Sequence, residues 1–265
     1  MFLHLFCPIK TENDMSKVVI TRPYAQGQEF ARILSKGVYD LKSGPFTIKS
    51  GRLILEPLLR IEIRDFQISG TVHYDGVIIT SVNAIPAIKK NPNLLDTPFY
   101  CVGKKTAEGL RAIGVVNIAQ CCQTVEPLID ELKSAGRNQR FLYLRGQDVS
   151  VDIKSAIQSN DIIVDEAVCY SAETADHFSE SFLDDLRNQR IGLVTLFSKR
   201  TAEVFVRLIQ QYQKENSVDA DQIDILCISQ PVLEYVSSVF KKENIIVSDK
   251  PDMKAMAEAV HRYCS

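Results

Sequence analysis

Short apolar runs alternate along the chain with stretches in which apolar residues recur at helical spacing. The first run, residues 18–21, reads VVIT; Phe30, Ile33 and Leu34 then share one face of a helix expected over residues 24–36, which Gly37 ends. Runs of the same character occupy residues 77–80, 100–102, 141–144, 192–197 and 225–228. Continuous apolar strands bounded by helices are typical of parallel sheets buried on both faces. The pattern therefore predicts an α/β protein with doubly wound parallel sheets.

The chain also repeats short motifs at a nearly constant spacing. ITSVNA at residues 79–84 resembles LFSKRT at 196–201, and VGKKT at 102–106 resembles ISQPV at 228–232. Arg22, which follows VVIT, matches Arg145, which follows FLYL. The three offsets lie between 117 and 126 residues. Three matches at nearly one spacing predict two similar domains of about 120 residues each.

Two segments interrupt the alternation of strands and helices. Residues 38–58 contain several Gly and Pro, and residues 163–172 form a second β-rich stretch. If both are extended connections, the middle of the chain is a domain inserted into the first. We therefore expect a discontinuous first domain (residues 15–50 and 173–265), an inserted second domain (60–163) and linker strands at 51–59 and 164–172. Residues 1–14 are expected to be an extended or disordered start, with synthesis beginning at either Met1 or Met15.

The composition excludes several classes of protein. The chain has 265 residues, 45% of them hydrophobic, and its 31 Lys and Arg nearly balance its 33 Asp and Glu. This is too apolar and too weakly charged for a disordered chain, and it produces no field that would favour nucleic acid or an anionic membrane. No 18-residue apolar run occurs, and the apolar first eight residues lack a basic region and a cleavage site. We expect a cytoplasmic monomer.

Sequence motifs for metals, nucleotides and nucleophiles are absent. The seven Cys form no C-x-x-C pair and the four His are isolated, so no zinc-type spacing exists. Gly103 and Gly109 do not fit G-x-G-x-x-G, and VGKKT has Pro98 where a P-loop has its first glycine. The chain also lacks the G-x-S-x-G elbow of hydrolases. We expect no metal and no cofactor.

The turns that follow the predicted strands are rich in hydroxyls, small residues and cations. In parallel sheets, ligands bind at the carboxyl ends of strands, where helix N-termini present free N–H groups. GKKT at 103–106 and SKRT at 198–201 place paired cations in a first helical turn, where they oppose the helix dipole. An anionic ligand held between the helix ends would remove this conflict. Alternatively, these long side chains simply extend into solvent.

Six motifs occur in a defined order: ITRP (20–23), DGVIITSVNAI (75–85), VGKKTAEGLRAIG (102–114), YLRG (143–146), VCYSA (168–172) and FSKRTAE (197–203). In this order and spacing they resemble the uroporphyrinogen-III synthase family. EPLLRI (56–61) is similar to the family's linker segment, and the resemblance covers nearly all of residues 16–265. It implies two α/β domains joined by two extended strands, with an active site in the cleft between them.

The resemblance also implies a reaction. The family is a cofactor-free hydro-lyase that cyclises hydroxymethylbilane, a linear tetrapyrrole with acetate and propionate groups on every ring, and inverts its last ring. Loss of the hydroxymethyl oxygen as water gives a reactive azafulvene, and the substituted ring carbon then attacks through a spiro intermediate. Such catalysis depends largely on positioning, and a hydroxyl that protonates the leaving oxygen would add to it.

Four residues of this chain, Tyr170, Thr106, Ser81 and Ser198, match positions to which the family gives a role, and eight others are expected to contact the substrate. Tyr170, in VCYSA, is expected to assist the loss of water; the alternative is that it packs within the linker. The expected substrate-binding residues are Arg22, Ser81, Asn83, Gly103, Lys104, Thr106, Arg145, Gly146, Ser198, Lys199 and Ser229. The alternatives are that the hydroxyl residues cap helices, that Asn83 bonds its own turn, and that the two arginines extend into solvent.

One departure from the family pattern concerns the second of the repeated turns. Family members carry G-x-x-T-A there, whereas residues 229–233 read SQPVL, so Val232 replaces the threonine and that contact is lost or moved. The region 38–55 is also longer than in the family. A noncatalytic two-domain protein that closes on a small anionic ligand is therefore a second hypothesis.

Overall fold

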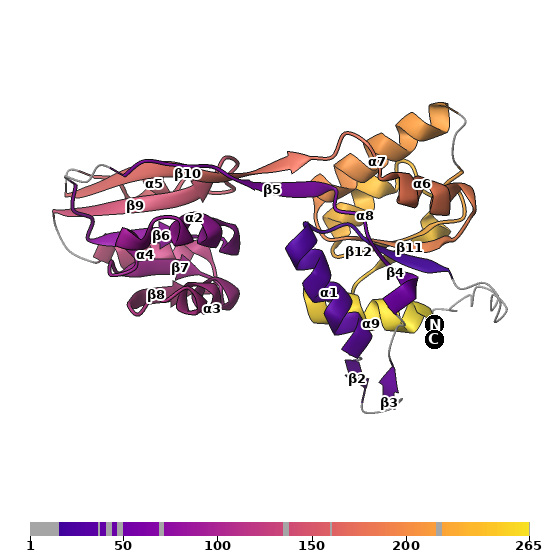
Figure 1. Cartoon of the computed structure of the whole chain (residues 1–265), viewed down its shortest axis with the longest axis horizontal. Helices are drawn as coiled ribbons and strands as arrows, with labels where there is room; N and C mark the ends of the chain where they lie inside the picture. Colours follow the sequence, from indigo (N-terminus) through magenta and orange to yellow (C-terminus); the bar gives the residue numbers. More distant parts are fainter. Residues whose placement is uncertain are drawn as a thin grey trace. The chain divides into compact units, whose positions relative to one another are not determined.

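The chain folds into two compact units, the second inserted into the first (Figure 1). The computed structural model describes residues 16–36, 38–40, 44–46, 50–68, 72–134, 138–159, 161–215 and 219–264. Gly37 and the expected start at residues 1–14 lie outside these ranges. Unit 1 contains the described residues up to Arg60 and from Thr174 onward, and unit 2 contains Ile61–Glu173.

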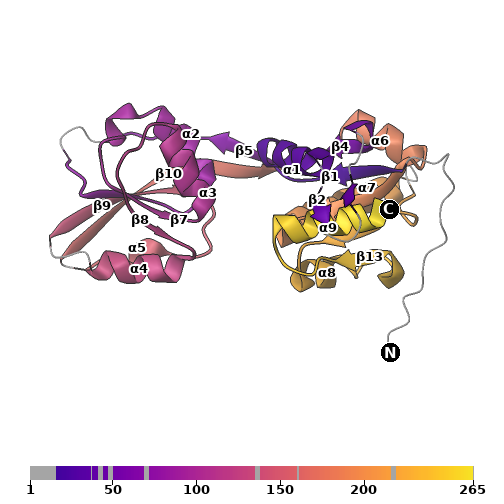
Figure 2. The same ribbon diagram turned by 90° about the horizontal axis from the view of Figure 1, so that it is seen from below.

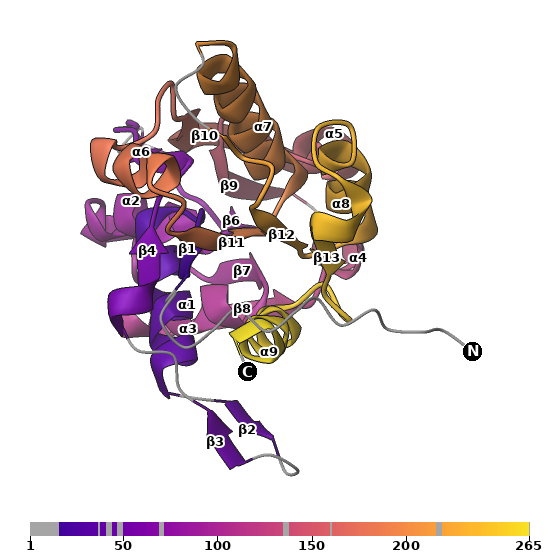
Figure 3. The ribbon, with the colours of Figure 1, turned by 90° about the vertical axis from the view of Figure 1, so that its right-hand side faces the viewer.

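Unit 1 is built on a five-stranded parallel sheet of order β13-β12-β11-β1-β4. Helices α1 and α9 cover one face of this sheet, and helices α6, α7 and α8 cover the other (Figure 3). The strands are β1 (Lys17–Ile20), β4 (Leu53–Leu55), β11 (Ile191–Leu196), β12 (Asp224–Cys227) and β13 (Ile245–Val247). The helices are α1 (Tyr24–Lys36), α6 (Glu180–Arg187), α7 (Lys199–Lys214), α8 (Gln230–Val236) and α9 (Met253–Cys264).

Unit 2 is built on a six-stranded sheet of order β5-β10-β9-β6-β7-β8. Helices α2 and α3 lie on one face and α4 and α5 on the other (Figure 2). The strands are β5 (Leu59–Ile63), β6 (Gly76–Ile79), β7 (Phe99–Val102), β8 (Ile118–Cys122), β9 (Gln139–Gly146) and β10 (Ile162–Thr174). The helices are α2 (Ile85–Lys89), α3 (Lys104–Ala112), α4 (Val125–Ser134) and α5 (Ile153–Ile157). The predicted fold class, two α/β units with parallel sheets, is confirmed.

Shorter elements complete the described chain. An antiparallel pair, β2 (Val38–Asp40) and β3 (Gly44–Phe46), occupies part of the segment that was expected to be longer than in the family. Single 3₁₀ turns are η1 (Ser50–Arg52), η2 (Val82–Ala84), η3 (Pro92–Leu94) and η4 (Lys242–Asn244). Within the described ranges, no helix has the length and apolar character needed to cross a membrane.

The segments expected to link the domains are largely sheet strands. Leu53–Leu55 form β4, which pairs with β1 because its alternating side chains reach apolar clusters on both faces of the unit 1 sheet. Residues 162–170 of β10 pair with β9 in unit 2. The chain passes between the units inside β5 and at the end of β10, since the boundaries fall at residues 60–61 and 173–174.

The two sheets share one topology once the insertion is taken into account. Strands β4, β1, β11, β12 and β13 of unit 1 follow the same spatial order as β10, β9, β6, β7 and β8 of unit 2. The three repeated motifs fall on the equivalent pairs β11 and β6, β12 and β7, and β1 and β9. The sequence repeat therefore corresponds to a repeated order of parallel strands.

Burial on both faces explains the uninterrupted apolar runs. In β11, Val194 and Leu196 face the cluster formed with α6, α7 and α8, whereas Leu193 faces the cluster formed with α1 and α9. Successive side chains of a strand point to opposite faces, so a strand covered on both sides needs apolar residues at every position. All six residues of β11 are buried.

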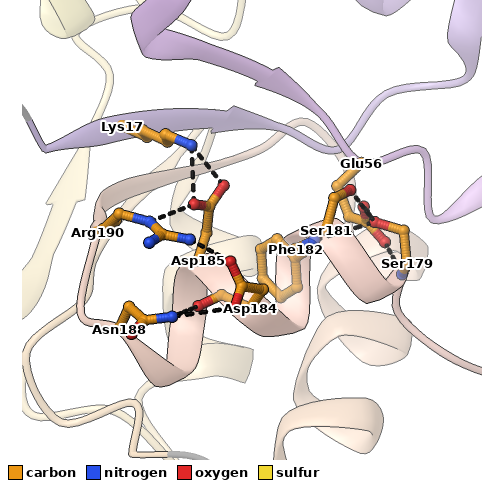
Figure 4. A network of polar contacts seen from close by, with 9 residues as sticks. All are labelled: Lys17, Glu56, Ser179, Ser181, Phe182, Asp184, Asp185, Asn188 and Arg190. Carbon is orange, nitrogen blue, oxygen red and sulfur yellow. Dashed lines mark hydrogen bonds and ion pairs between the residues drawn. The ribbon is translucent and has the colours of Figure 1, made fainter.

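A buried carboxylate holds α6 to the amino-terminal edge of the unit 1 sheet (Figure 4). The two oxygens of Asp185 accept hydrogen bonds of 2.7 Å from the ammonium of Lys17, and Oδ1 accepts one of 2.6 Å from Nε of Arg190. Burial alone would raise the pKa of Asp185, but these two cations outweigh it and the pKa is lowered. The ionised carboxylate therefore stabilises the folded state.

We expect Asp185→Asn to lower the free energy of unfolding by about 2–4 kcal/mol at pH 7, because it leaves two cations without their buried partner. A carboxylate whose pKa is lowered in the folded state stabilises it above the unfolded pKa of about 4 and loses this effect at lower pH. The difference from wild type, measured by urea unfolding, should therefore shrink between pH 7 and pH 3.

Asp184→Asn is the matched control, because Asp184 lies on the same helix and its side chain is 64% exposed. We expect this variant to change the free energy of unfolding by less than about 1 kcal/mol. An Asp185→Asn deficit that stays constant down to pH 3 would show that packing, and not the charge, is what Asp185 contributes.

Candidate functional site

Eleven of the twelve predicted site residues lie at or just beyond strand carboxyl ends, and Tyr170 lies within β10, opposite the last residue of β9. Those of each unit gather at one edge of its sheet. In the unit 2 sheet, β9 lies between β10 and β6, and β7 lies on the other side of β6. Parallel strands bring their carboxyl ends to the same edge, where helix N-termini also meet. The unit 2 set is Ser81, Asn83, Gly103, Lys104, Thr106, Arg145, Gly146 and Tyr170. The unit 1 set is Arg22, Ser198, Lys199 and Ser229.

Tyr170 is held against the backbone at the end of β9. Its Cα pairs in register with that of Gly146, and its carbonyl accepts a hydrogen bond of 2.9 Å from the N–H of Gln147. A Cβ atom on Gly146 would lie only 2.8 Å from two ring carbons of Tyr170 and 2.9 Å from its hydroxyl oxygen. The ring therefore occupies the space that a side chain at position 146 would need. Gly146 permits this packing of Tyr170 because it lacks a Cβ.

The Tyr170 phenol remains protonated at neutral pH. Burial raises its pKa above the ordinary value, and a hydrogen bond with the Ser81 hydroxyl opposes this less strongly. The Ser81 hydroxyl also accepts a hydrogen bond of 3.2 Å from the N–H of Asn83, which caps the turn η2. The Tyr170 phenol is thus a protonated hydroxyl group beside the capped turn η2.

A second pair of hydroxyls lies beside this one. The Thr80 hydroxyl and the Tyr143 phenol are 3.3 Å apart, and burial raises the pKa of Tyr143. Neither residue was among the predicted site residues. Thr80 could have been included because it directly precedes Ser81 in the same turn. Tyr143 lies within the apolar run FLYL, where a sequence pattern indicates a core residue and nothing more.

Arg145 is engaged by its own unit. Its Nε lies 3.0 Å from a carboxylate oxygen of Glu166, and its Nη1 donates hydrogen bonds of 3.0 and 3.1 Å to the carbonyls of Gly146 and Gln147. The guanidinium therefore joins β9 to β10 and supports the backbone under Tyr170. A ligand carboxylate would have to compete with Glu166 for it.

The first turn of α3 has a different construction. Gly103 adopts φ +88°, which favours glycine, and its N–H donates to the carbonyl of Cys122 at 2.8 Å. Thr106 is buried behind this turn, whereas Lys104 is 90% exposed and lies 3.8 Å from Glu108. An ion pair between two exposed side chains contributes little to stability. In this structure the Lys104 side chain therefore extends into solvent, which was the alternative to an anion site.

In unit 1, Arg22 is half-buried without a carboxylate partner. Its guanidinium lies 4.5 Å from the centroid of the Phe197 ring, and Nη2 donates to Oε1 of Gln26 at 2.9 Å. Nε is buried and has no hydrogen-bond partner, and within the described ranges no carboxylate lies at ion-pairing distance from Arg22. Burial lowers the pKa of Arg22, against a smaller opposing effect of Glu29. Arg22 is therefore a cation that an external anion could satisfy.

The other unit 1 residues begin helices. Ser198 caps α7: its hydroxyl accepts a hydrogen bond of 3.1 Å from the N–H of Thr201 and lies 2.8 Å from the Thr201 hydroxyl. Lys199 is exposed. Ser229 precedes α8 without making a side-chain cap, and Val232 packs in the core. The substitution of valine for the family threonine thus serves the packing of α8.

A surface hollow of unit 2 lies away from these residues. It has a volume of about 500 Å³ and is lined by residues that include Tyr74, Asn91 and Thr97, near the amino-terminal ends of β6 and β7. None of the twelve predicted residues lines it. Among the residues whose placement is described, no group of three or more His, Cys, Asp or Glu could hold a metal ion.

Comparison with known proteins places the chain among tetrapyrrole enzymes. The family model described as uroporphyrinogen-III synthase HemD matches residues 45–258. The uroporphyrinogen-III synthase of Synechococcus elongatus is 25% identical over 201 residues, which is 72% of this chain and 74% of that protein. A crystal structure of uroporphyrinogen-III synthetase from Helicobacter pylori covers 94% of this chain and 99% of its own, with a TM-score of 0.59 and 14% identity. That last likeness concerns the fold.

The contact between Gly146 and Tyr170 predicts a coupled effect on stability. We expect Gly146→Ala to lower the free energy of unfolding by about 1–3 kcal/mol, because its Cβ would overlap the Tyr170 ring. In a Tyr170→Ala background the same change should cost clearly less, since the ring is gone. Thermal unfolding of the wild type, both single variants and the double variant measures this coupling. Equal costs in the two backgrounds would refute the assigned contact.

Proposed function

Because this chain belongs to the uroporphyrinogen-III synthase family, we propose that it cyclises hydroxymethylbilane to uroporphyrinogen III and that Tyr170 protonates the leaving hydroxyl. Enzymes of this family act in tetrapyrrole biosynthesis. The observation that supports the assignment to Tyr170 is its phenol, whose pKa burial raises and which is held over Gly146 at the carboxyl edge of the unit 2 sheet.

The proposed step transfers one proton. The C–O bond of the hydroxymethyl group breaks, its electron pair leaves with the oxygen, and the Tyr170 proton completes a water molecule. The pyrrole nitrogen supplies the electrons that form the azafulvene. Attack by the substituted carbon of the last ring gives the spiro intermediate, whose bond to the preceding methylene then breaks. The unsubstituted carbon of the same ring bonds to that methylene instead, and the proton that this carbon loses can restore the phenol. The overall change is loss of one water without net oxidation or reduction, so the reaction itself requires no redox cofactor.

The substrate-binding groups are proposed at both sheet edges. Carboxylates of the substrate would be held by the Arg22 guanidinium and by N–H groups at the starts of α7 and α8 in unit 1. In unit 2 they would meet the turns that begin at Ser81 and Gly103. Because Arg145 already pairs with Glu166, we propose that it supports the backbone beneath Tyr170 and does not bind substrate directly. The cytoplasmic location of the protein and its monomeric state remain predictions.

The function is tested by supplying freshly made hydroxymethylbilane and separating the oxidised products by isomer. We expect the type III isomer to increase with enzyme concentration, at the expense of the type I isomer that forms without assistance. If only type I forms at every enzyme level, the synthase function is refuted. Saturable binding of hydroxymethylbilane in that case would support the noncatalytic binding protein.

Tyr170→Phe is the matched variant for the proton donor, because it keeps the ring over Gly146 and removes the hydroxyl. General acid catalysis contributes about 10²–10⁴-fold, so we expect kcat to fall about 100-fold or more while the melting temperature changes little. An unchanged kcat would remove Tyr170 from the chemical step and leave the function itself standing.

A further inference from the structure

The two passages of the chain between the units are fastened together inside unit 1. The outgoing passage, residues 56–58, follows β4, and the returning passage, residues 175–179, follows β10. The N–H of Ala175, on the returning passage, donates to the carbonyl of Leu58 on the outgoing one at 3.0 Å. Leu58 is fully buried among core residues of unit 1, so this contact is fixed to the body of the unit.

Glu56 adds a side-chain clamp between the same two segments (Figure 4). Its Oε1 accepts a hydrogen bond of 2.8 Å from the N–H of Ser179, and its Oε2 accepts one of 2.6 Å from the Ser179 hydroxyl. Ser179 is also the N-cap of α6, since its hydroxyl accepts from the N–H of Phe182 at 3.2 Å. Both carboxylate oxygens are thus aimed at one residue of the returning passage.

The clamp is joined to the end of β1, just before Arg22. The backbone N–H of Glu56 donates to the carbonyl of Ile20 at 3.0 Å, and that of Leu58 donates to the carbonyl of Thr21 at 3.1 Å. Thr21 is itself fixed, because its hydroxyl donates to the carbonyl of Thr195 at 2.6 Å. The outgoing passage, the returning passage and the turn before Arg22 are therefore held as one assembly.

A requirement for stability alone does not explain a carboxylate at this position. Glu56 is only 6% exposed, and within the described part of the chain no Lys, Arg or His lies at ion-pairing distance from it. Burial of a charge without an ionic partner carries a desolvation cost, which here only the N-terminus of α6 and two hydrogen bonds offset. What the carboxylate supplies is two acceptors with fixed directions. A neutral amide would keep one of these acceptors and turn the other into a donor, so the Ser179 hydroxyl would have to accept where it now donates, and the negative charge beside the N-terminus of α6 would be lost.

We propose that Glu56 is a positioning residue for the reaction, because it locks both passages between the units to the carboxyl edge of the unit 1 sheet. This inference rests on the proposed function. It assigns Glu56 no contact with substrate. A loosened clamp would leave Arg22 and Tyr170 intact but let the passages leave unit 1 in more than one direction. Because the inverted product depends on positioning, kcat and the share of type III should both fall.

The test compares Glu56→Gln and Ser179→Ala with Asp185→Asn. Asp185 anchors the same helix, α6, through Lys17 and Arg190, and it has no role in the proposed catalysis. Each variant is assayed at a temperature well below its own melting point, with kcat, KM and the ratio of type III to type I product as readouts. We expect Glu56→Gln and Ser179→Ala to lower kcat about 10-fold or more and to raise the share of type I. Asp185→Asn should lower the melting temperature and keep the wild-type kcat and isomer ratio.

Two results would overturn the proposal. One is a wild-type kcat and isomer ratio in Glu56→Gln, and the other is an equal change in Asp185→Asn. Hydrogen exchange at the amides of Ala175 and Ser179 reports on the clamp independently of activity, and relative to the other amides of unit 1 it should become faster in Glu56→Gln but not in Asp185→Asn. If the wild type makes no type III product, the proposed function fails together with the catalytic role of Glu56. The exchange measurement then still decides whether the clamp exists.

Discussion

The parallel direction of the strands is the constraint on which the rest of this molecule depends. When all strands of a sheet point one way, their carboxyl ends and the N-termini of the following helices meet at one edge. That edge offers unpaired N–H groups and short turns, and both units place their predicted site residues there. The opposite edge of the unit 1 sheet has a structural role, because there Asp185, Lys17 and Arg190 hold α6 in place.

The repeated strand order shows how two equivalent edges have diverged. Arg22 and Arg145 lie near the carboxyl ends of equivalent strands, yet Arg145 pairs with Glu166 whereas, among the described residues, no carboxylate lies at ion-pairing distance from Arg22. Thr106 and Val232 are equivalent too, and both are buried. The fifth strand differs most: β10 carries Tyr170, whereas its counterpart β4 is followed by Glu56. In our account unit 2 supplies the proton donor, and unit 1 supplies a cation and the anchor for the chain passages.

Features that depend on one stretch of chain were predictable from the sequence. The apolar runs predicted strands because both faces of each sheet are covered, and the three motif offsets predicted the repeat. Leu53–Leu55 were not recognised as a sheet strand, because three residues between Gly51 and Pro57 make too short a pattern. Gly146 was expected to bind substrate, and only the structure shows that the Tyr170 ring fills the space beside it. The clamp at Glu56 was also missed, since Glu56 and Ser179 lie 123 positions apart along the chain.

The central claim is that one tetrapyrrole is bound by the carboxyl edges of both sheets. Amide hydrogen exchange with and without saturating uroporphyrinogen III, kept reduced, tests it most directly. We expect slower exchange in the turns after β1 and β11 of unit 1 and after β6, β7 and β9 of unit 2, with no change at the amino-terminal ends of these strands. Protection confined to one unit, or centred on the hollow near Tyr74 and Thr97, would contradict the account.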